Sequence, residues 1–252
     1  MVTRIGINGF GRIGRLALRS IKQYHNELKV VAINDLADTN TNAHLLKYDS
    51  TYGIYEGDIK SDQNSIKLDG ESIKAFSEKE PAKIPWGDYE VDIVIESTGR
   101  FADKELAAQH LNGGAKKVII STTSATADTT IVMGVNQHNY SPEEHHIVSN
   151  ASCTTNCVTP LVKVIFENFG IDKALINTVH AYTNDQSLLD IYHKDPRRTR
   201  AAALNIIPTT TGAAKAVAQV IPELKGLIHG ISLRVPVGSV SIADVTAVVS
   251  RD

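Results

Sequence analysis

The chain has 252 residues, of which 42% are hydrophobic and 21% charged, a balance typical of a globular protein with one large or two ordinary domains. Its net charge of -2 offers no basic surface for nucleic acid, and no apolar run approaches the length of a membrane-spanning helix. Two cysteines in so long a chain favour a reducing compartment. We therefore expect a cytoplasmic protein with a small-molecule partner, and neither nucleic acid nor a membrane as a partner.

The first 150 residues alternate short apolar strands with segments of helical periodicity. A strand at residues 4–8, the glycine-rich residues 9–14, a helix and a strand at residues 28–34 make a β-α-β unit. An Asp-Gly pair at residues 69–70 divides two alternating runs and predicts a β-hairpin. Further helices are expected at 42–48 and 104–111, and further strands at 91–96, 117–121, 130–133 and 146–149. This alternation predicts a Rossmann-type, doubly wound, mostly parallel sheet.

The remainder of the chain has longer strands and fewer helices. Strands are expected at 174–182, 230–235 and 240–249, with a helix at 213–220 and a charge-rich, poorly periodic segment at 183–200. Such a pattern favours an α+β domain with an antiparallel or mixed sheet. We predict a dinucleotide-binding domain at residues 1–152 and a catalytic domain at residues 153–252.

The glycines of the first unit have the spacing Gly-x-Gly-x-x-Gly, at Gly9, Gly11 and Gly14. The motif follows a predicted strand and opens a helix, and Asp35 ends the next strand. Such glycines let a pyrophosphate approach the helix N-terminus, and an acid at this place accepts hydrogen bonds from ribose hydroxyls and repels a 2'-phosphate. The alternative is a glycine turn in an α/β domain that binds no ligand.

A second motif places Cys153 just before a segment of helical periodicity at residues 157–169, which stops at Gly170. In the first turn of a helix, unpaired N-H groups and the macrodipole favour a thiolate, which is a nucleophile. The alternative is that Cys153 and Cys157 are two small core residues on one helical face. Their spacing makes a disulfide between them improbable on geometric grounds, and no metal site is indicated.

His180, on a predicted strand, is a candidate base for Cys153, although a strand histidine is more often a core or edge residue. Hydroxyls, glycine and arginines that suit phosphate oxygens follow it in the chain. For any single one of them, a solvated loop is the alternative.

Four motifs together closely resemble phosphorylating glyceraldehyde-3-phosphate dehydrogenase, and the resemblance spans essentially the whole chain. They are residues 8–15 (NGFGRIGR), 149–157 (SNASCTTNC), 182–186 (YTNDQ) and 207–214 (IPTTTGAA). The resemblance implies that D-glyceraldehyde 3-phosphate is oxidised with NAD and inorganic phosphate to 1,3-bisphosphoglycerate, through a thiohemiacetal and a thioester on Cys153. It also implies a homotetramer with a role in glycolysis and gluconeogenesis.

The same resemblance assigns roles to individual residues. Cys153 is the nucleophile, and His180 activates it and relays protons. The residues expected to hold NAD are Gly9, Gly11, Arg12, Ile13, Gly14, Asp35, Lys79, Thr98 and Ser121. Those expected to bind the attacking phosphate are Ser152, Thr154, Arg198, Thr211 and Gly212. Those expected to bind the phosphate of the substrate are Thr183, Asp185 and Arg234.

The sequence also departs from the family. The chains of the family continue past the position where this one ends, so part of the catalytic domain is expected to be missing, with exposed sheet edges and weakened activity. Residues 191–192 (Ile-Tyr) stand where NAD-specific members usually have Leu-Pro, which leaves dual use of NAD and NADP open. Two alternatives remain: erythrose-4-phosphate dehydrogenase, and an inactive NAD-binding fragment.

Overall fold

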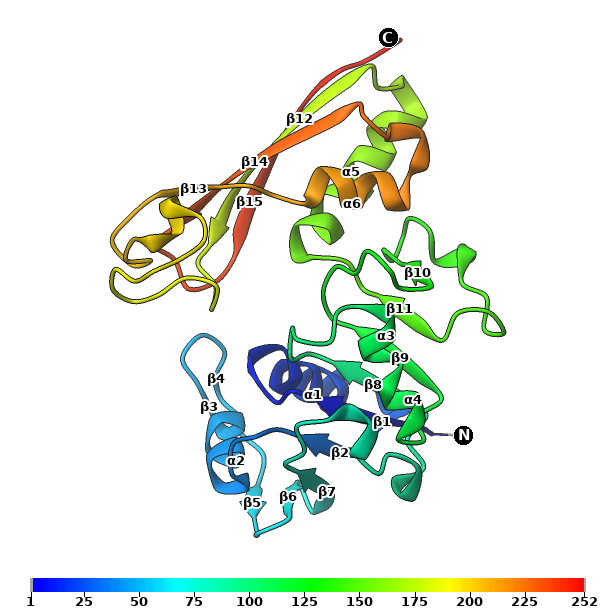
Figure 1. Cartoon of the computed structure of the whole chain (residues 1–252), viewed down its shortest axis with the longest axis vertical. Coiled ribbons are helices and arrows are strands. Elements are labelled where there is room, and N and C mark those ends of the chain that lie inside the picture. Colours follow the sequence, from blue (N-terminus) through cyan, green and yellow to red (C-terminus); the bar gives the residue numbers. More distant parts are fainter. Residues whose placement is uncertain (1, 252) are drawn as a thin grey trace. The chain divides into compact units, whose positions relative to one another are not determined.

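The computed structural model describes residues 2–251 and separates them into two compact units. The N-terminal unit contains the residues up to 130 and residues 140–151, and the C-terminal unit contains residues 131–139 and those from 152 onward. In Figure 1 the N-terminal unit runs from blue to green, and the C-terminal unit ends in red.

The N-terminal unit is built on a sheet that has nine strands within residues 2–251. Its central strands are parallel and lie in the order third, second, first, fourth, fifth, sixth along the chain. They are β7 (Glu71–Phe76), β2 (Leu28–Asn34), β1 (Thr3–Asn8), β8 (Ile93–Glu96), β9 (Lys117–Ile120) and β11 (Ile147–Ser149). This is the strand order of a doubly wound dinucleotide-binding fold, so the predicted fold class of this unit is confirmed.

An antiparallel hairpin extends one edge of the sheet. Strands β6 (Ser65–Leu68) and β7 are joined through Asp69 and Gly70, whose φ angles are +51° and +83°. Two consecutive positive φ angles are what a two-residue hairpin turn of this kind requires, which explains the Asp-Gly pair. The short strand β5 (Ile59–Ser61) continues the sheet beyond β6, and β3 (Tyr48–Asp49) pairs with β4 (Gly53–Ile54) separately.

Helices cover both faces of this sheet. On one face, α1 (Arg12–Tyr24) and α2 (Thr39–Lys47) bury Leu18 and Leu46 against Ile5 and Ile7. On the other face, Trp86 and Val94 belong to a second buried cluster. Burial on both faces explains why the parallel strands are continuously apolar rather than alternating.

Two sequence expectations need correction. The helix expected at 104–111 is divided into α3 (Lys104–Ala107) and α4 (Gln109–Asn112), because Leu111 N bonds to Ala108 O three residues back instead of four. The strand expected at 130–133 is only β10 (Thr129–Thr130). The chain turns at Val132, whose N-H donates to the Asn136 side chain at 2.8 Å, so Ile131 and Val132 are buried in a turn and not in a strand.

The C-terminal unit packs two helices, α5 (Cys153–Phe169) and α6 (Ala213–Val220), beside a mixed four-stranded sheet (Figure 1). Strand β12 (Lys173–Ala181) is parallel to β14 (Ile228–Val235) and antiparallel to β15 (Ser241–Val248), while β13 (Ile207–Thr209) is antiparallel to β14. The predicted mixed sheet is therefore confirmed among the described residues.

The glycine turn after β1 gives a test of the fold. Gly9 has φ +87°, and a Cβ on it would lie 2.7 Å from Thr98 N, whereas a Cβ on Gly11 would meet no atom within 4 Å. We expect Gly9→Ala to lower the free energy of unfolding of the N-terminal unit by about 1–3 kcal/mol. Gly11→Ala should change it by no more than about 1 kcal/mol.

Urea unfolding followed by the fluorescence of Trp86, the single tryptophan of the chain, measures this difference. Equal stability of the two variants would contradict the close approach of Gly9 to Thr98.

Candidate active site

The glycine turn joins the carboxyl end of β1 to the start of α1. The Ser97 hydroxyl donates to the carbonyl oxygen of Gly9 at 2.7 Å, and a Cβ on Gly14 would collide with that same carbonyl oxygen. Glycines at both positions therefore let the turn fold tightly onto the first turn of α1. The free N-H groups at that helix start suit a pyrophosphate.

Asp35 follows β2 and faces this turn. Its two oxygens accept hydrogen bonds from Phe10 N at 2.7 Å and from Ala37 N at 2.9 Å. These bonds fix the orientation of the carboxylate, and each oxygen keeps acceptor capacity for the hydroxyls of a ribose. The arrangement fits the NAD adenosine, and the negative charge disfavours a 2'-phosphate there.

Three more of the predicted cofactor residues follow the carboxyl ends of neighbouring strands. Lys79 comes after β7, Thr98 after β8 and Ser121 after β9. Since these strands are parallel and flank β1 and β2, the structure brings all three to the same edge of the sheet as the glycine turn.

The two residues that open α1 are exposed. The guanidinium of Arg12 lies 5.9 Å from the ring centre of Tyr52, with Nη2 3.3 Å from the Thr51 hydroxyl, and the side chain of Ile13 is 52% exposed. Arg12 is thus held beside the helix start, where an anion would bind.

In the C-terminal unit, Cys153 is the first residue of α5. The Ser152 side chain caps the helix by accepting from Thr155 N at 3.1 Å, and Cys153 is exposed. The predicted position of this cysteine in the first turn is confirmed.

The sulfur of Cys153 faces His180, which is buried on β12. The Sγ atom lies 3.2 Å from Nε2. This hydrogen bond lowers the pKa of the Cys153 thiol from its ordinary value of 9.0 to about 7, against the burial that raises it, and the backbone of Thr154 lowers it further. The same bond raises the pKa of His180, which burial and Arg234 lower. The pair is therefore suited to a thiolate beside a proton-carrying imidazole.

The other ring nitrogen of His180 has two neighbours. Arg234 lies opposite His180 in the parallel pairing of β12 and β14, and its Nη1 is 2.7 Å from His180 Nδ1, while Ala181 O is 2.6 Å from the same nitrogen. Arginine only donates and a carbonyl only accepts, so Nδ1 can satisfy one of them at a time. Arg234 Nη1 also donates to Ala181 O at 3.0 Å, so the three groups form one compact set.

The residues expected to bind phosphate come from several segments of this unit. Arg198, in the 3-10 turn at Pro196–Thr199, pairs with Asp185 and reaches Thr210 O at 3.5 Å, next to Thr211 and Gly212 at the start of α6. The Nε atoms of Arg198 and Arg234 are buried and have no hydrogen-bond partner within residues 2–251. Two such donors fit a site for anions.

The remaining members of the set make local contacts. Thr183 N donates to the Gln186 side chain at 3.4 Å, and Asp185 also lies 3.6 Å from His193. Ser152 and Thr154 flank Cys153 at the helix start. The roles proposed for all these residues stay predictions.

One buried polar group of the N-terminal unit was not predicted from the sequence. His110 is fully buried against Glu96, beside Asn8. The signal in the sequence that could have revealed this group is that Asn8 and Glu96 are polar residues at the carboxyl ends of apolar strands.

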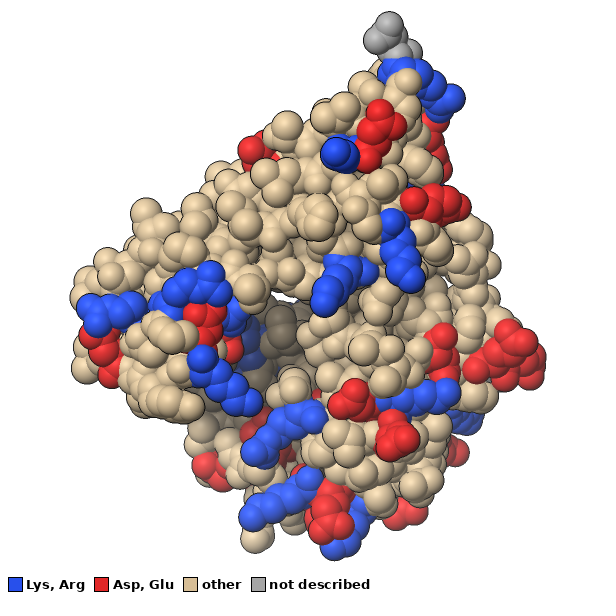
Figure 2. Space-filling view, turned by 45° about the horizontal axis from the view of Figure 1, so that its top comes forward, with Lys and Arg blue, Asp and Glu red and all other residues tan. Residues whose placement is uncertain are grey.

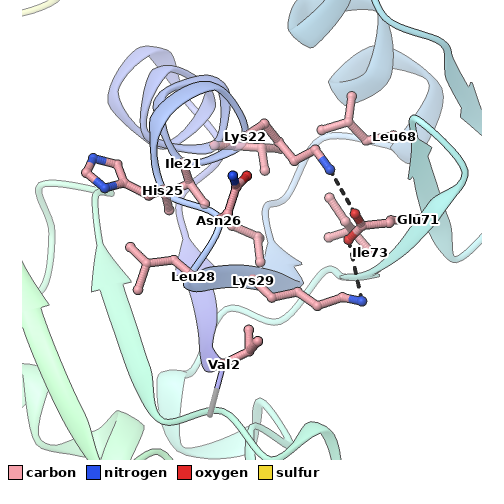
Figure 3. Close-up of a pocket in the computed structure, with 12 residues that line it drawn as sticks. Val2, Ile21, Lys22, His25, Asn26, Leu28, Lys29, Leu68, Glu71 and Ile73 are labelled. Atoms are coloured by element: carbon pink, nitrogen blue, oxygen red, sulfur yellow. Dashed lines mark hydrogen bonds and ion pairs between the residues drawn. The ribbon is translucent and has the colours of Figure 1, made fainter.

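A cavity of about 170 Å³ lies at the opposite, amino edge of the same sheet (Figure 3). It is lined by Ile21, Lys22 and Leu28, among others, and Glu71 pairs with Lys22 at 2.9 Å and with Lys29 at 3.4 Å. Ligands of parallel sheets bind at the carboxyl edge, and both lysines here already face a carboxylate, so this cavity is not the cofactor site.

Within residues 2–251 there is neither a metal-binding cluster nor a membrane-spanning helix. No group of three or more His, Cys, Asp or Glu side chains in them is arranged to hold a metal ion. None of the helices in this range combines the length and the apolar character needed to cross a membrane.

The pKa of Cys153 gives a test of the pair. Thiolate is the reactive form, so alkylation by iodoacetamide should rise with pH and be half-maximal at about pH 7. In His180→Asn the main cause that lowers the pKa is lost and burial remains, so the midpoint should move up, toward the ordinary value of a thiol. Measuring the rates in a Cys157→Ser background confines the reaction to Cys153. An unchanged midpoint in His180→Asn would contradict the assigned pair.

Comparison with known proteins gives consistent matches over the chain. The family model described as "Glyceraldehyde 3-phosphate dehydrogenase, NAD binding domain" matches residues 3–104, and the one described as the C-terminal domain matches residues 152–252. Glyceraldehyde-3-phosphate dehydrogenase 2 of Streptomyces avermitilis is 57% identical over 252 residues, which are all of this chain and 75% of that protein. The glyceraldehyde-3-phosphate dehydrogenase of Geobacillus stearothermophilus is 54% identical with the same coverage, and glyceraldehyde-3-phosphate dehydrogenase 1 of Bacillus subtilis is 51% identical. On this basis the chain belongs to the glyceraldehyde-3-phosphate dehydrogenase family.

Proposed function

We propose that this protein oxidises D-glyceraldehyde 3-phosphate to 1,3-bisphosphoglycerate, with NAD as the oxidant and inorganic phosphate as the second substrate. The observation that carries the proposal is the 3.2 Å contact between Cys153 Sγ and His180 Nε2 at the start of α5. A sulfur with a pKa of about 7 is substantially ionised at neutral pH and is a strong nucleophile toward an aldehyde.

The chemistry follows from these two side chains. The thiolate of Cys153 attacks the aldehyde carbon, and the oxygen takes a proton from His180 to give a thiohemiacetal. His180 accepts this proton back from the hydroxyl as hydride leaves. NAD, when bound, supplies the hydride acceptor. The resulting thioester on Cys153 keeps the acyl group activated, and attack by phosphate releases the acyl phosphate and the thiolate. N-H groups at the start of α5 are in position to stabilise the tetrahedral oxyanions.

Each unit contributes a different part. We propose residues 1–152 as the NAD-binding domain, except residues 131–139 and Ser152, which belong to the C-terminal unit. In it, Asp35 binds the adenosine ribose and the glycine turn binds the pyrophosphate. Residues 153–252 form the catalytic domain as far as this sequence extends. Within it, the buried Nε groups of Arg198 and Arg234 donate no hydrogen bond within residues 2–251, although Arg198 Nε lies 3.9 Å from Asp195 Oδ2. They support the assignment of anion sites for the attacking phosphate and for the phosphate of the substrate, respectively.

We also propose that the protein forms a homotetramer in the cytoplasm. The face of the C-terminal sheet that points away from α5 and α6 exposes apolar side chains on three neighbouring strands. They are Leu175 (48% exposed), Ile231 (52%), Ile242 (68%) and Val248 (60%). On this face the apolar side chains alternate with polar ones such as Asn177 and Asp244, a mixture that is typical of an interface between subunits. Both cysteines are free thiols, which suits a reducing compartment.

The surface charge supports small-molecule substrates. Basic and acidic side chains are interspersed on the face shown in Figure 2. In the segment after β12, Arg197 pairs with Asp195 and Arg200 with Asp190, each at 2.7 Å. Arginines neutralised in this way do not form the unpaired basic surface that a nucleic acid would need.

Kinetics of the two catalytic residues test the function. Formation of NADH from the aldehyde and NAD should require phosphate or arsenate and should be abolished in Cys153→Ser. In His180→Asn we expect kcat to fall by about 10²–10⁴-fold, because general-base assistance is lost. Turnover that does not depend on phosphate, or full activity without Cys153, would refute the proposal. A higher kcat/KM for erythrose 4-phosphate than for glyceraldehyde 3-phosphate would instead favour the related dehydrogenase.

The choice of coenzyme is tested at Asp35. Replacing it with serine removes two acceptor oxygens and one negative charge, so we expect NAD to bind about tenfold more weakly and NADP to bind more tightly. Calorimetric titration of both dinucleotides measures this. A variant that retains the wild-type preference would show that Asp35 does not contact the ribose.

A further inference from the structure

A buried polar network lies under the glycine turn, at the carboxyl ends of the central strands. Its side chains come from β1, β2, β8, α4 and the segment before β8, and they are at most 4% exposed. They are Asn8, Asn34, Trp86, Glu96 and His110. Polar groups this deeply buried are costly unless each is hydrogen-bonded, so their hydrogen bonds indicate which parts of the chain the network fixes in place.

Glu96 is the centre of this network. Its Oε2 accepts from Asn8 Nδ2 at 2.5 Å and faces His110 Nε2 at 3.0 Å. Its Oε1 accepts from the backbone N-H of Thr98 at 2.8 Å and from the Thr98 hydroxyl at 2.5 Å. Four donors thus converge on one carboxylate, which is the full complement that its two oxygens can accept.

The hydrogen bonds also define the state of His110. Trp86 Nε1 can only donate, and it lies 3.0 Å from His110 Nδ1, so this nitrogen must be the acceptor. The proton of a neutral His110 is then on Nε2, directed at Glu96. The negative charge of Glu96 is therefore stabilised by hydrogen bonds from neutral donors. The same hydrogen bonds fix the orientation of each donor group.

One arm of the network reaches the loop that follows β7. Asn8 Oδ1 accepts from Asn34 Nδ2 at 2.8 Å. Asn34 in turn bonds both backbone groups of Glu78, at 2.7 Å to its N-H and at 2.9 Å to its carbonyl oxygen. The residue after Glu78 is Lys79, one of the residues expected beside the cofactor.

The other arm sets the position of the glycine turn. Thr98, which Glu96 holds by two bonds, packs so closely on Gly9 that a Cβ there would lie 2.7 Å from Thr98 N and 2.8 Å from Thr98 Cγ2. Displacing Thr98 toward Gly9 is impossible without moving the turn, and displacing it away opens a gap under the turn. The carboxylate thus holds the surface on which the turn rests.

We propose that Glu96 is a positioning residue for the dinucleotide, which fixes the 98–99 turn and the glycine turn against each other, and that it touches no substrate itself. This inference rests on the NAD binding proposed above. A role in stability alone gives a weaker account of the network, because buried charges can often be replaced by apolar side chains without loss of stability.

The test compares Glu96→Gln with Val94→Ala. The glutamine has nearly the same shape, but its amide NH2 must face donors, either Asn8 and His110 or Thr98. Val94 is fully buried two residues earlier on the same strand and belongs to the apolar cluster that also contains Trp86, so its truncation weakens the core next to the network while leaving every hydrogen-bonding group of the network in place. NAD affinity is measured by calorimetry and Tm by scanning calorimetry, on the full chain.

We expect Glu96→Gln to raise the Kd for NAD about tenfold or more at temperatures where the variant is folded. Val94→Ala should lower Tm at least as much as Glu96→Gln does, and it should leave the Kd for NAD within about twofold of wild type. A Kd that is unchanged in folded Glu96→Gln, or that changes equally in Val94→Ala, would overturn the inference.

Two further variants decide the matter if Glu96→Gln does not fold. Thr98→Val removes the hydroxyl that donates to Glu96 and accepts from Arg100 N at 3.0 Å, and it should weaken NAD binding, whereas Thr98→Ser keeps that hydroxyl and should restore binding. Equal Kd values for these two variants would overturn the inference. Failure of the wild-type chain to bind NAD is a separate result, which would refute the proposed function itself and this role with it.

Discussion

The hydrogen bond between Cys153 and His180 is the interaction on which the proposed chemistry depends. It requires that α5 begin at the sulfur, that β12 carry the imidazole, and that the two elements pack so that Sγ and Nε2 lie 3.2 Å apart. Each requirement has a local cause. Ser152 caps the helix one residue before Cys153, and the alternating burial of β12 turns Ile176, Thr178 and His180 to the same side.

Arg234 is a second charged neighbour of the His180 imidazole. It approaches Nδ1 while Cys153 approaches Nε2, so the two neighbours act on opposite sides of one ring. The thiolate raises the pKa of His180 and the guanidinium lowers it. These opposing neighbours act on one imidazole, which has to accept a proton and return it during the reaction.

Much of this could be predicted from the sequence because the relevant patterns are local. The Asp69-Gly70 pair specifies a hairpin through its φ angles, and the residues around Cys153 specify a helix start within a few positions. What could not be predicted depends on contacts between distant residues. Glu96 meets Asn8 across 88 positions, and Arg234 meets His180 across 54, in a register that hydrophobic periodicity does not specify. The segment at 183–200 is likewise organised by ion pairs and not by an apolar pattern, so its structure was not apparent from periodicity.

The most direct test of the Cys153–His180 pair is an NMR titration of the ¹⁵N-labelled imidazole of His180 in the wild type and in Cys153→Ser. Because the bond to the sulfur is the main cause that raises the pKa of His180, while burial and Arg234 lower it, removing the sulfur should lower that pKa clearly. If His180 titrates at the same pH in both proteins, the imidazole does not sense the sulfur, and the catalytic pair proposed here does not exist.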